Sequence, residues 1–92
     1  MASYRELCEI GESFTGFVGR GLPAEIAAVD AAMRQLDGIG ATTIARLQGL
    51  RRPYHLLVAG EMWCPDCQVN IPAFDFIQRT QPLIQLAIIS RG

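Results

Sequence analysis

The spacing of apolar positions divides the chain into a helical first half and a second half in which a strand, a helix and a strand follow one another. Over residues 4–18 the apolar side chains fall near one helical face. Ser3 and Glu6 have the spacing of a capping box at the start of this stretch. The pattern therefore predicts one long helix that ends within residues 16–21.

Two more helices are predicted before the first strand. Pro23 suits the first turn of the next helix, because the N–H that proline lacks has no partner at that position. The apolar stripe of this helix has spacings of 4, 3, 4 and 3 residues, at Leu22, Ile26, Val29, Met33 and Leu36. Gly38 closes the helix. We expect Thr42 or Thr43 to cap a short third helix, which Pro53 terminates.

The remaining pattern is that of a β-α-β unit. Residues 54–59 are almost continuously apolar, as expected for a parallel strand that is buried on both faces. Residues 65–80 have a helical pattern, and residues 84–89 form a second apolar run of strand length. Such an order gives a right-handed crossover between parallel strands. The sequence thus predicts an α/β fold with a helical part over residues 1–52 and a β-α-β part over residues 53–92.

Charge and composition exclude several functional classes. Eight basic and nine acidic residues give a net charge of −1, which offers no electrostatic footprint for nucleic acid or an anionic membrane. No apolar run approaches the roughly 18 residues of a membrane span, and acidic residues lie where a signal peptide would be apolar. Three cysteines are too few for a secreted disulfide scaffold. We expect a reducing, cytoplasmic location without nucleic-acid or membrane partners.

The residues that carry chemistry lie between the first strand and the helix that follows it. Cys64 and Cys67 form a Cys-x-x-Cys dithiol there, with Pro65 at the first helical position. Unpaired N–H groups and the positive end of the helix dipole favour a thiolate at a helix start. A thiolate attacks disulfides, and a second thiol one turn later can resolve the mixed disulfide. We assign Cys64 as the more exposed attacking thiol and Cys67 as the more buried resolving thiol.

Asp66, between the two cysteines, has two opposed effects. An acidic residue in the first turn stabilises a helix by about 0.3–1 kcal/mol. Its negative charge, however, disfavours a neighbouring thiolate and so makes the dithiol more reducing than one flanked by neutral or basic residues.

A metal site is the main alternative for the two cysteines. A structural zinc ion needs four ligands, and the other candidates in this chain are Cys8 and His55. We expect Cys8 to be a small buried apolar residue. His55 lies at the opposite end of the strand, about 20 Å from Cys64 at the usual strand rise. Two copies of the chain could instead share two dithiols, so a metal-binding dimer remains open.

Trp63, Cys64 and Cys67 after an apolar strand, with Pro72 five residues beyond the second cysteine, resemble the thioredoxin family. The sequence Trp-Cys-Pro-Asp-Cys is similar to that of a subset of cytosolic thioredoxin-related disulfide reductases. The resemblance implies a thiol–disulfide oxidoreductase in which Cys64 and Cys67 alternate between dithiol and disulfide, without a cofactor. Its substrates would be protein or small-molecule disulfides, and a cellular dithiol reductant would restore it. Trp63 would shape the surface, Pro65 fix the helix start and Pro72 kink the helix.

The chain departs from the thioredoxin pattern in two ways. Thioredoxins carry a buried acid six residues before the first cysteine, where this chain has Val58; Glu61 and Asp66 are candidate substitutes. The family's cis-proline loop, two further strands and last helix have no counterpart here. The resemblance thus implies a partial, truncated thioredoxin-like domain over residues 1–92, with open strand edges that tend to pair with another chain.

Two expectations follow from these open edges. Either the sequence is part of a longer protein, or the chain self-associates through its strand edges. A catalytically idle thioredoxin-like fragment, acting as an interaction module, remains an alternative to the enzyme.

Overall fold

A computed structural model describes residues 3–90; residues 1–2 and 91–92 of the predicted domain lie outside this range. The elements in chain order are α1 (Tyr4–Ile10), α2 (Phe14–Gly19), α3 (Pro23–Gln35), the 3₁₀ helix η1 (Leu36–Gly38), α4 (Ala41–Gln48), β1 (Tyr54–Ala59), α5 (Pro65–Thr80) and β2 (Ile84–Ile89). The two strands form a parallel sheet. This is the predicted α/β fold, with N-terminal helices followed by a parallel β-α-β unit.

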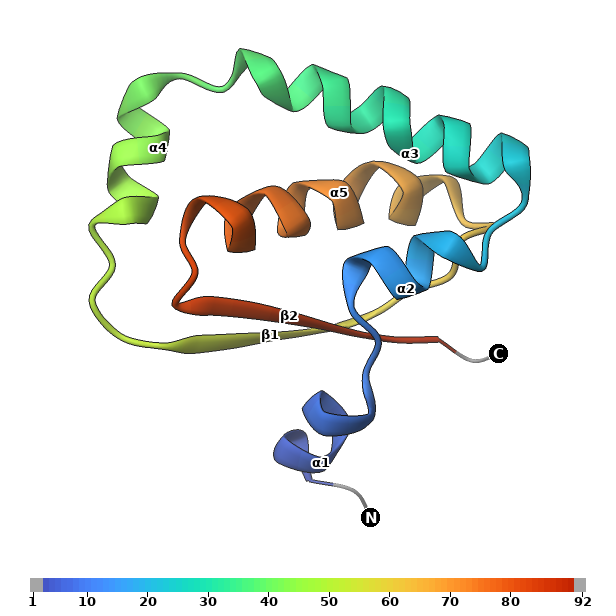
Figure 1. The fold of residues 1–92 in the computed structure, drawn as a ribbon, viewed down its shortest axis with the longest axis horizontal. Coiled ribbons are helices and arrows are strands. Elements are labelled where there is room, and N and C mark those ends of the chain that lie inside the picture. Colours follow the sequence, from blue (N-terminus) through green and yellow to red (C-terminus); the bar gives the residue numbers. More distant parts are fainter. Residues whose placement is uncertain (1–2, 91–92) are drawn as a thin grey trace.

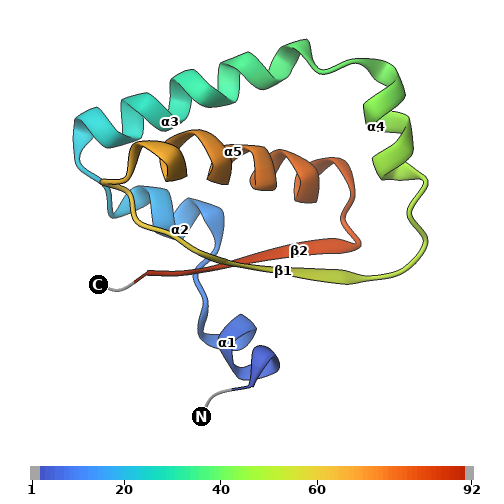
Figure 2. The same cartoon turned by 180° about the vertical axis from the view of Figure 1, so that it is seen from behind.

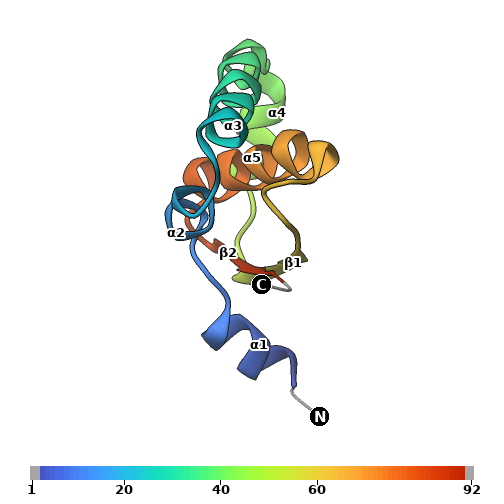
Figure 3. The ribbon, with the colours of Figure 1, turned by 90° about the vertical axis from the view of Figure 1, so that its right-hand side faces the viewer.

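The helices lie in layers on either side of the sheet. Figure 1 and Figure 3 show α5 next to the sheet with α3 beyond it, whereas α1 lies on the opposite face. Figure 2 shows α4 at the end of the molecule where β1 begins. The core joins α2, α3, α5, β2 and the loop after β1, through Phe14, Phe17, Val29, Met62, Ile71, Leu86 and Ile88.

The β-α-β unit has the predicted bounds. Its strands are in parallel register from Tyr54 opposite Ile84 to Ala59 opposite Ile89. A parallel pair needs a crossover connection, and α5 provides it across the face that carries the core. In the described part of the chain, no helix is both long enough and apolar enough to span a membrane.

The prediction of one long helix near the N-terminus is wrong, because the chain breaks around Glu12 into α1 and α2. The backbone of Glu12 forms an antiparallel bridge with Ile88 of β2. A Cβ atom on Gly11 would lie 2.8 Å from the Cβ of Ala87, so the close approach to the sheet requires glycine. Ser13 then caps α2 through its side chain. A contact with the far end of the chain thus overrides the helical periodicity.

The next two helices follow the sequence more closely. α3 begins with Pro23 at its first position, as predicted, and the N–H of Leu22 donates to Oε1 of Glu25 (2.8 Å). α4 starts earlier than expected: its N-cap is Gly40, so the predicted cap by Thr42 or Thr43 is wrong.

The prediction that β1 is buried on both faces is also wrong. The strand is exposed at Tyr54, His55 and Ala59 and half-buried between them. Among the described elements, α1 is the helix on the second face, and its seven residues are too short to cover a strand of this length.

We expect Gly11→Ala to lower the free energy of unfolding by about 1–3 kcal/mol, because the added methyl overlaps Ala87. Gly19→Ala is the matched control, since a Cβ at Gly19 meets nothing within 4 Å. Urea unfolding followed by circular dichroism measures both variants. Equal midpoints for the two would show that the bridge at Glu12 does not require the close approach.

Candidate active site

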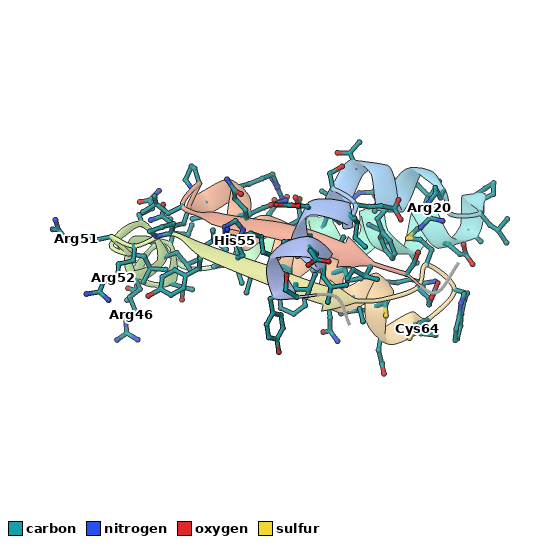
Figure 4. All side chains as sticks on the ribbon, turned by 90° about the horizontal axis from the view of Figure 1, so that it is seen from below. Arg20, Arg46, Arg51, Arg52, His55 and Cys64 are labelled. Atoms are coloured by element: carbon teal, nitrogen blue, oxygen red, sulfur yellow. The ribbon has the colours of Figure 1, made fainter. Side chains whose placement is uncertain are left out.

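The dithiol lies where β1 passes into α5. Cys64 is the N-cap of α5 with extended backbone dihedral angles, and Pro65 occupies the first helical position, as the sequence predicted. Cys67 lies one turn further along the helix. Both side chains are half-buried, and the two sulfurs are not joined in a disulfide. Figure 4 shows Cys64 at one end of the molecule, and Arg46, Arg51 and Arg52 at the opposite end.

The surroundings of Cys64 favour its thiolate. A hydrogen bond from the backbone N–H of Cys67 lowers the pKa of the Cys64 thiol below its usual value, and the Cys67 side chain adds to this effect. The N–H of Asp66 acts in the same direction, whereas partial burial and the Asp66 carboxylate act against it. The backbone N–H groups at the start of α5 therefore lower the pKa of the Cys64 thiol by more than the Asp66 carboxylate raises it.

The surroundings of Cys67 have the opposite effect. Burial is the largest cause that raises the pKa of the Cys67 thiol, and the charges of Cys64 and Asp66 raise it further. The backbone N–H of Glu61 opposes them in part. The pair is therefore asymmetric: Cys64 loses its proton first, and Cys67 keeps its proton to higher pH.

Gly60 brings the end of β1 close to the buried sulfur. A Cβ atom at this position would lie 2.6 Å from Cδ1 of Ile71 and 3.4 Å from Sγ of Cys67. Any side chain here would push Ile71 aside and would touch the sulfur of Cys67. Gly60 was not among the sequence-predicted site residues, although a glycine at the end of a strand often marks such a close approach.

Gln68 holds the loop that carries Trp63. Its Nε2 donates to the carbonyl oxygen of Met62 (2.6 Å), and Met62 itself is 8% exposed within the core. The indole of Trp63 stays 69% exposed next to the dithiol. Gln68 was not among the sequence-predicted site residues, because its contact with Met62 depends on how the loop folds back onto the first turn of α5.

The other residues that the sequence singled out differ in how deeply they are buried. Pro72 is buried inside α5, where it removes one helical hydrogen bond. Val58 is half-buried against the core, so the position of the thioredoxin acid is apolar. Of the two candidate substitutes, Asp66 is exposed. Glu61 lowers the pKa of Cys67 through its backbone N–H. The pKa of Arg20 is raised mainly by Glu12, and the Glu61 carboxylate adds to this effect.

A small hollow of about 130 Å³ adjoins the loop before the dithiol. It is lined by Phe17, Arg20, Glu25, Glu61, Met62 and Trp63. The guanidinium of Arg20 forms an ion pair with Glu12 and donates to Oγ of Ser90 (2.7 Å). The N-terminal helices thus form one wall beside the loop that leads to the dithiol.

Cys8 and His55 lie away from the dithiol. Both line a separate hollow of about 1030 Å³ between α1 and the sheet, which includes neither Cys64 nor Cys67. Cys8 is half-buried there instead of fully buried. Within residues 3–90, no three His, Cys, Asp or Glu side chains gather closely enough to hold a metal ion.

Comparison with protein families agrees with this arrangement. A family model described as Thioredoxin matches residues 20–92. The chain belongs to the thioredoxin family. The thioredoxin match begins at Arg20, so it includes α3 and α4 as well as the β-α-β part from which the sequence motif came. A search of curated proteins found no match.

Two solved structures share the fold over nearly the whole chain. A protein of unknown function from Pseudomonas aeruginosa is 56% identical, with a TM-score of 0.94 over 100% of this chain and 57% of that chain. An HIV epitope-scaffold is also 56% identical, with a TM-score of 0.93 over 99% of this chain and 56% of that chain. The chain thus spans little more than half the length of each.

We expect Asp66→Asn to lower the pKa of the Cys64 thiol further, because the substitution removes a negative charge that disfavours the thiolate. The thiolate fraction at a given pH should therefore rise, as measured by ultraviolet absorbance against pH. Asp37→Asn is the control. The start of α3 lies near Trp63, whereas Asp37 lies in η1, after the opposite end of α3. An unchanged or higher thiol pKa in Asp66→Asn would contradict this account.

Proposed function

We propose that the chain is a thiol–disulfide oxidoreductase, a thioredoxin-like disulfide reductase that uses the Cys64–Cys67 dithiol. One observation carries the proposal: the pKa of the Cys64 thiol is lowered at the start of α5, while that of Cys67 is raised one turn away. Because the thiolate is the attacking species, this asymmetry supports Cys64 as the nucleophile.

The proposed reaction balances as two exchange steps. The Cys64 thiolate attacks one sulfur of a substrate disulfide, forms a mixed disulfide and releases the other sulfur as a thiolate, which takes up a proton. Cys67 then loses its proton and attacks the Cys64 sulfur, which forms the Cys64–Cys67 disulfide and frees the second substrate thiol. The protein is oxidised by two electrons and the substrate is reduced by two. A cellular dithiol reductant restores the protein by the reverse exchange.

Four neighbouring residues have supporting roles in this proposal. The exposed indole of Trp63 provides an apolar surface on which a substrate can rest near Cys64. Pro65 begins α5 and so orients the N–H groups that stabilise the thiolate. Asp66 moderates the acidity of Cys64, and Pro72 sets the course of the helix behind the pair.

The chemistry sets the proposed partners and location. Substrates are protein or small-molecule disulfides, and the exchange needs neither a metal nor an organic cofactor. A reducing compartment such as the cytoplasm would keep the dithiol ready to react.

We expect Cys64→Ser to abolish the reduction of insulin by the protein with dithiothreitol as reductant, because no attacking thiolate remains. Cys67→Ser should instead accumulate a mixed disulfide between Cys64 and the substrate, visible as a mass increase under non-reducing conditions. Cys8→Ser is the control and should keep full activity, since Cys8 lies on α1 away from the dithiol.

Equal activity in all three variants would contradict the proposal and favour a catalytically idle interaction module. Metal bound to purified protein, and lost in both Cys64→Ser and Cys67→Ser, would favour the metal-binding dimer.

A further inference from the structure

The hollow beside the loop before the dithiol has no role in the exchange steps proposed above. Its volume is about 130 Å³. Sites for small molecules and cofactors usually have volumes of about 300–1,000 Å³. The hollow is therefore too small for a whole cofactor, and it fits part of a larger ligand, such as one side chain of a peptide.

Contacts on two sides of Met62 hold one wall of the hollow in place. Nε2 of Gln68, in the first turn of α5, donates to the carbonyl oxygen of Met62 (2.6 Å). A Cβ atom on Gly21 would overlap Cε of Met62, so the turn between α2 and α3 packs closely against this side chain. The hollow is thus formed before a ligand arrives, as is usual for binding sites.

The apolar part of the lining suits the stem of a long side chain. Phe17 and Met62 are buried, whereas the indole of Trp63 is exposed. The methylene stems of lysine and arginine pack on apolar surface while their charged ends stay outside it. The face of an indole also attracts a cation that lies within about 6 Å of the ring centroid.

The polar part of the lining is mainly acidic. Glu25 and Glu61 are both half-buried there, and Oε1 of Glu25 accepts the N–H of Leu22 (2.8 Å), which fixes this carboxylate at the start of α3. Arg20 adds a positive charge, but its Nε donates to Oε2 of Glu12 (2.8 Å). Among the described residues that line or adjoin the hollow, three carboxylates thus accompany one guanidinium. This excess of negative charge favours a cationic ligand.

The hollow is within reach of a peptide that is bound at Cys64. Trp63 lines the hollow and directly precedes Cys64, and consecutive Cα atoms are about 3.8 Å apart. Figure 4 shows Arg20 at the same end of the molecule as Cys64, whereas the other labelled arginines lie at the opposite end. Positive charge that would repel a cationic substrate is therefore concentrated away from the dithiol.

We propose that the hollow binds a lysine or arginine side chain of the substrate, so that the protein prefers peptide and protein disulfides flanked by a basic residue. The stem of this side chain lies on Met62 and Trp63, and its charged end lies between Glu25 and Glu61. The inference rests on the proposed function, because it names the substrate class of the same dithiol. The disulfide itself is reduced by the two exchange steps already given, which this contact does not change.

The same lining disfavours an acidic flanking residue. A carboxylate at this position would lie beside the carboxylates of Glu25 and Glu61 and would be repelled, and a neutral side chain would gain no ion pair. The preference therefore decreases from basic to neutral to acidic substrates.

Three peptides test this order: each contains one internal disulfide, and they differ only in a Lys, Gln or Glu two residues from one cysteine. The rate at which the reduced protein opens each disulfide is followed by liquid chromatography. Each rate is divided by the rate with free dithiothreitol, because a charge near a disulfide also changes its intrinsic reactivity. We expect the Lys peptide to react about threefold to tenfold faster than the Glu peptide at low salt. Added salt should reduce this ratio, because it screens exposed charges.

Glu25→Gln and Glu61→Gln should each reduce the same ratio, because each removes a negative charge from the hollow. Glutamine at position 25 keeps an oxygen that can accept the N–H of Leu22, so the start of α3 is preserved. Glu9→Gln is the matched control and should keep the ratio, since Glu9 lies on α1 beside the separate hollow on the other face of the sheet.

A binding measurement tests the hollow without turnover. Trp63 is the single tryptophan of the chain, so its fluorescence reports on the hollow directly. The three peptides are titrated with serine in place of both cysteines. We expect a saturable change in emission with the Lys peptide, and a dissociation constant at least about threefold higher for the Glu peptide.

The outcomes separate this inference from the proposed function. Equal fluorescence titrations, equal relative rates for the three disulfide peptides, or the same loss of preference in Glu9→Gln would overturn the inference. Selective binding without reduction of any peptide would contradict the proposed function and leave the preference of the hollow standing. Neither selective binding nor reduction would contradict both.

Discussion

The parallel pairing of β1 with β2 is the constraint on which the rest of the molecule depends. Two parallel strands cannot be joined by a tight turn, so the chain must cross the sheet, and α5 makes that crossing. The crossing begins at the carboxyl end of β1, which brings the unpaired N–H groups of the first helical turn to the end of the strand. Cys64 occupies this junction, and its low thiol pKa follows from that position.

The same junction makes the two thiols different although they are one turn apart. Cys64 faces the free amides of α5, whereas Cys67 turns towards Gly60 and Ile71, where burial disfavours its thiolate. No acid occupies the position of Val58. Backbone N–H groups are the main cause that lowers the pKa of the Cys64 thiol, and burial is the main cause that raises the pKa of the Cys67 thiol. The close approach of Gly60 to Cys67 and the hydrogen bond from Gln68 to Met62 fix the loop between β1 and α5 against the first turn of the helix.

The two edges of the sheet differ in how far other parts of the chain cover them. Glu12 and Gln78 occupy the edge of β2, so the N-terminal helices and α5 together limit growth of the sheet on that side. The edge of β1 has no such cover within the described residues, and it ends at the dithiol. Both relatives of known structure extend well beyond the region that they share with this chain. Whatever pairs with β1 will therefore also lie next to Cys64.

The sequence by itself determined the elements that depend on local pattern. The bounds of β1, α5 and β2, the proline start of α3 and α5, and the place of Cys64 at a helix start all follow from hydrophobic spacing and proline chemistry. Contacts between elements decided the rest. The break at Glu12 depends on its bridge to Ile88 at the far end of the chain. The hydrogen bond from Leu86 to Gln78 and the approach of Gly60 to Cys67 join neighbouring elements across a loop, and no local periodicity encodes them. Only the folded sheet brings those partners together, because their hydrogen bonds and close contacts exist only there.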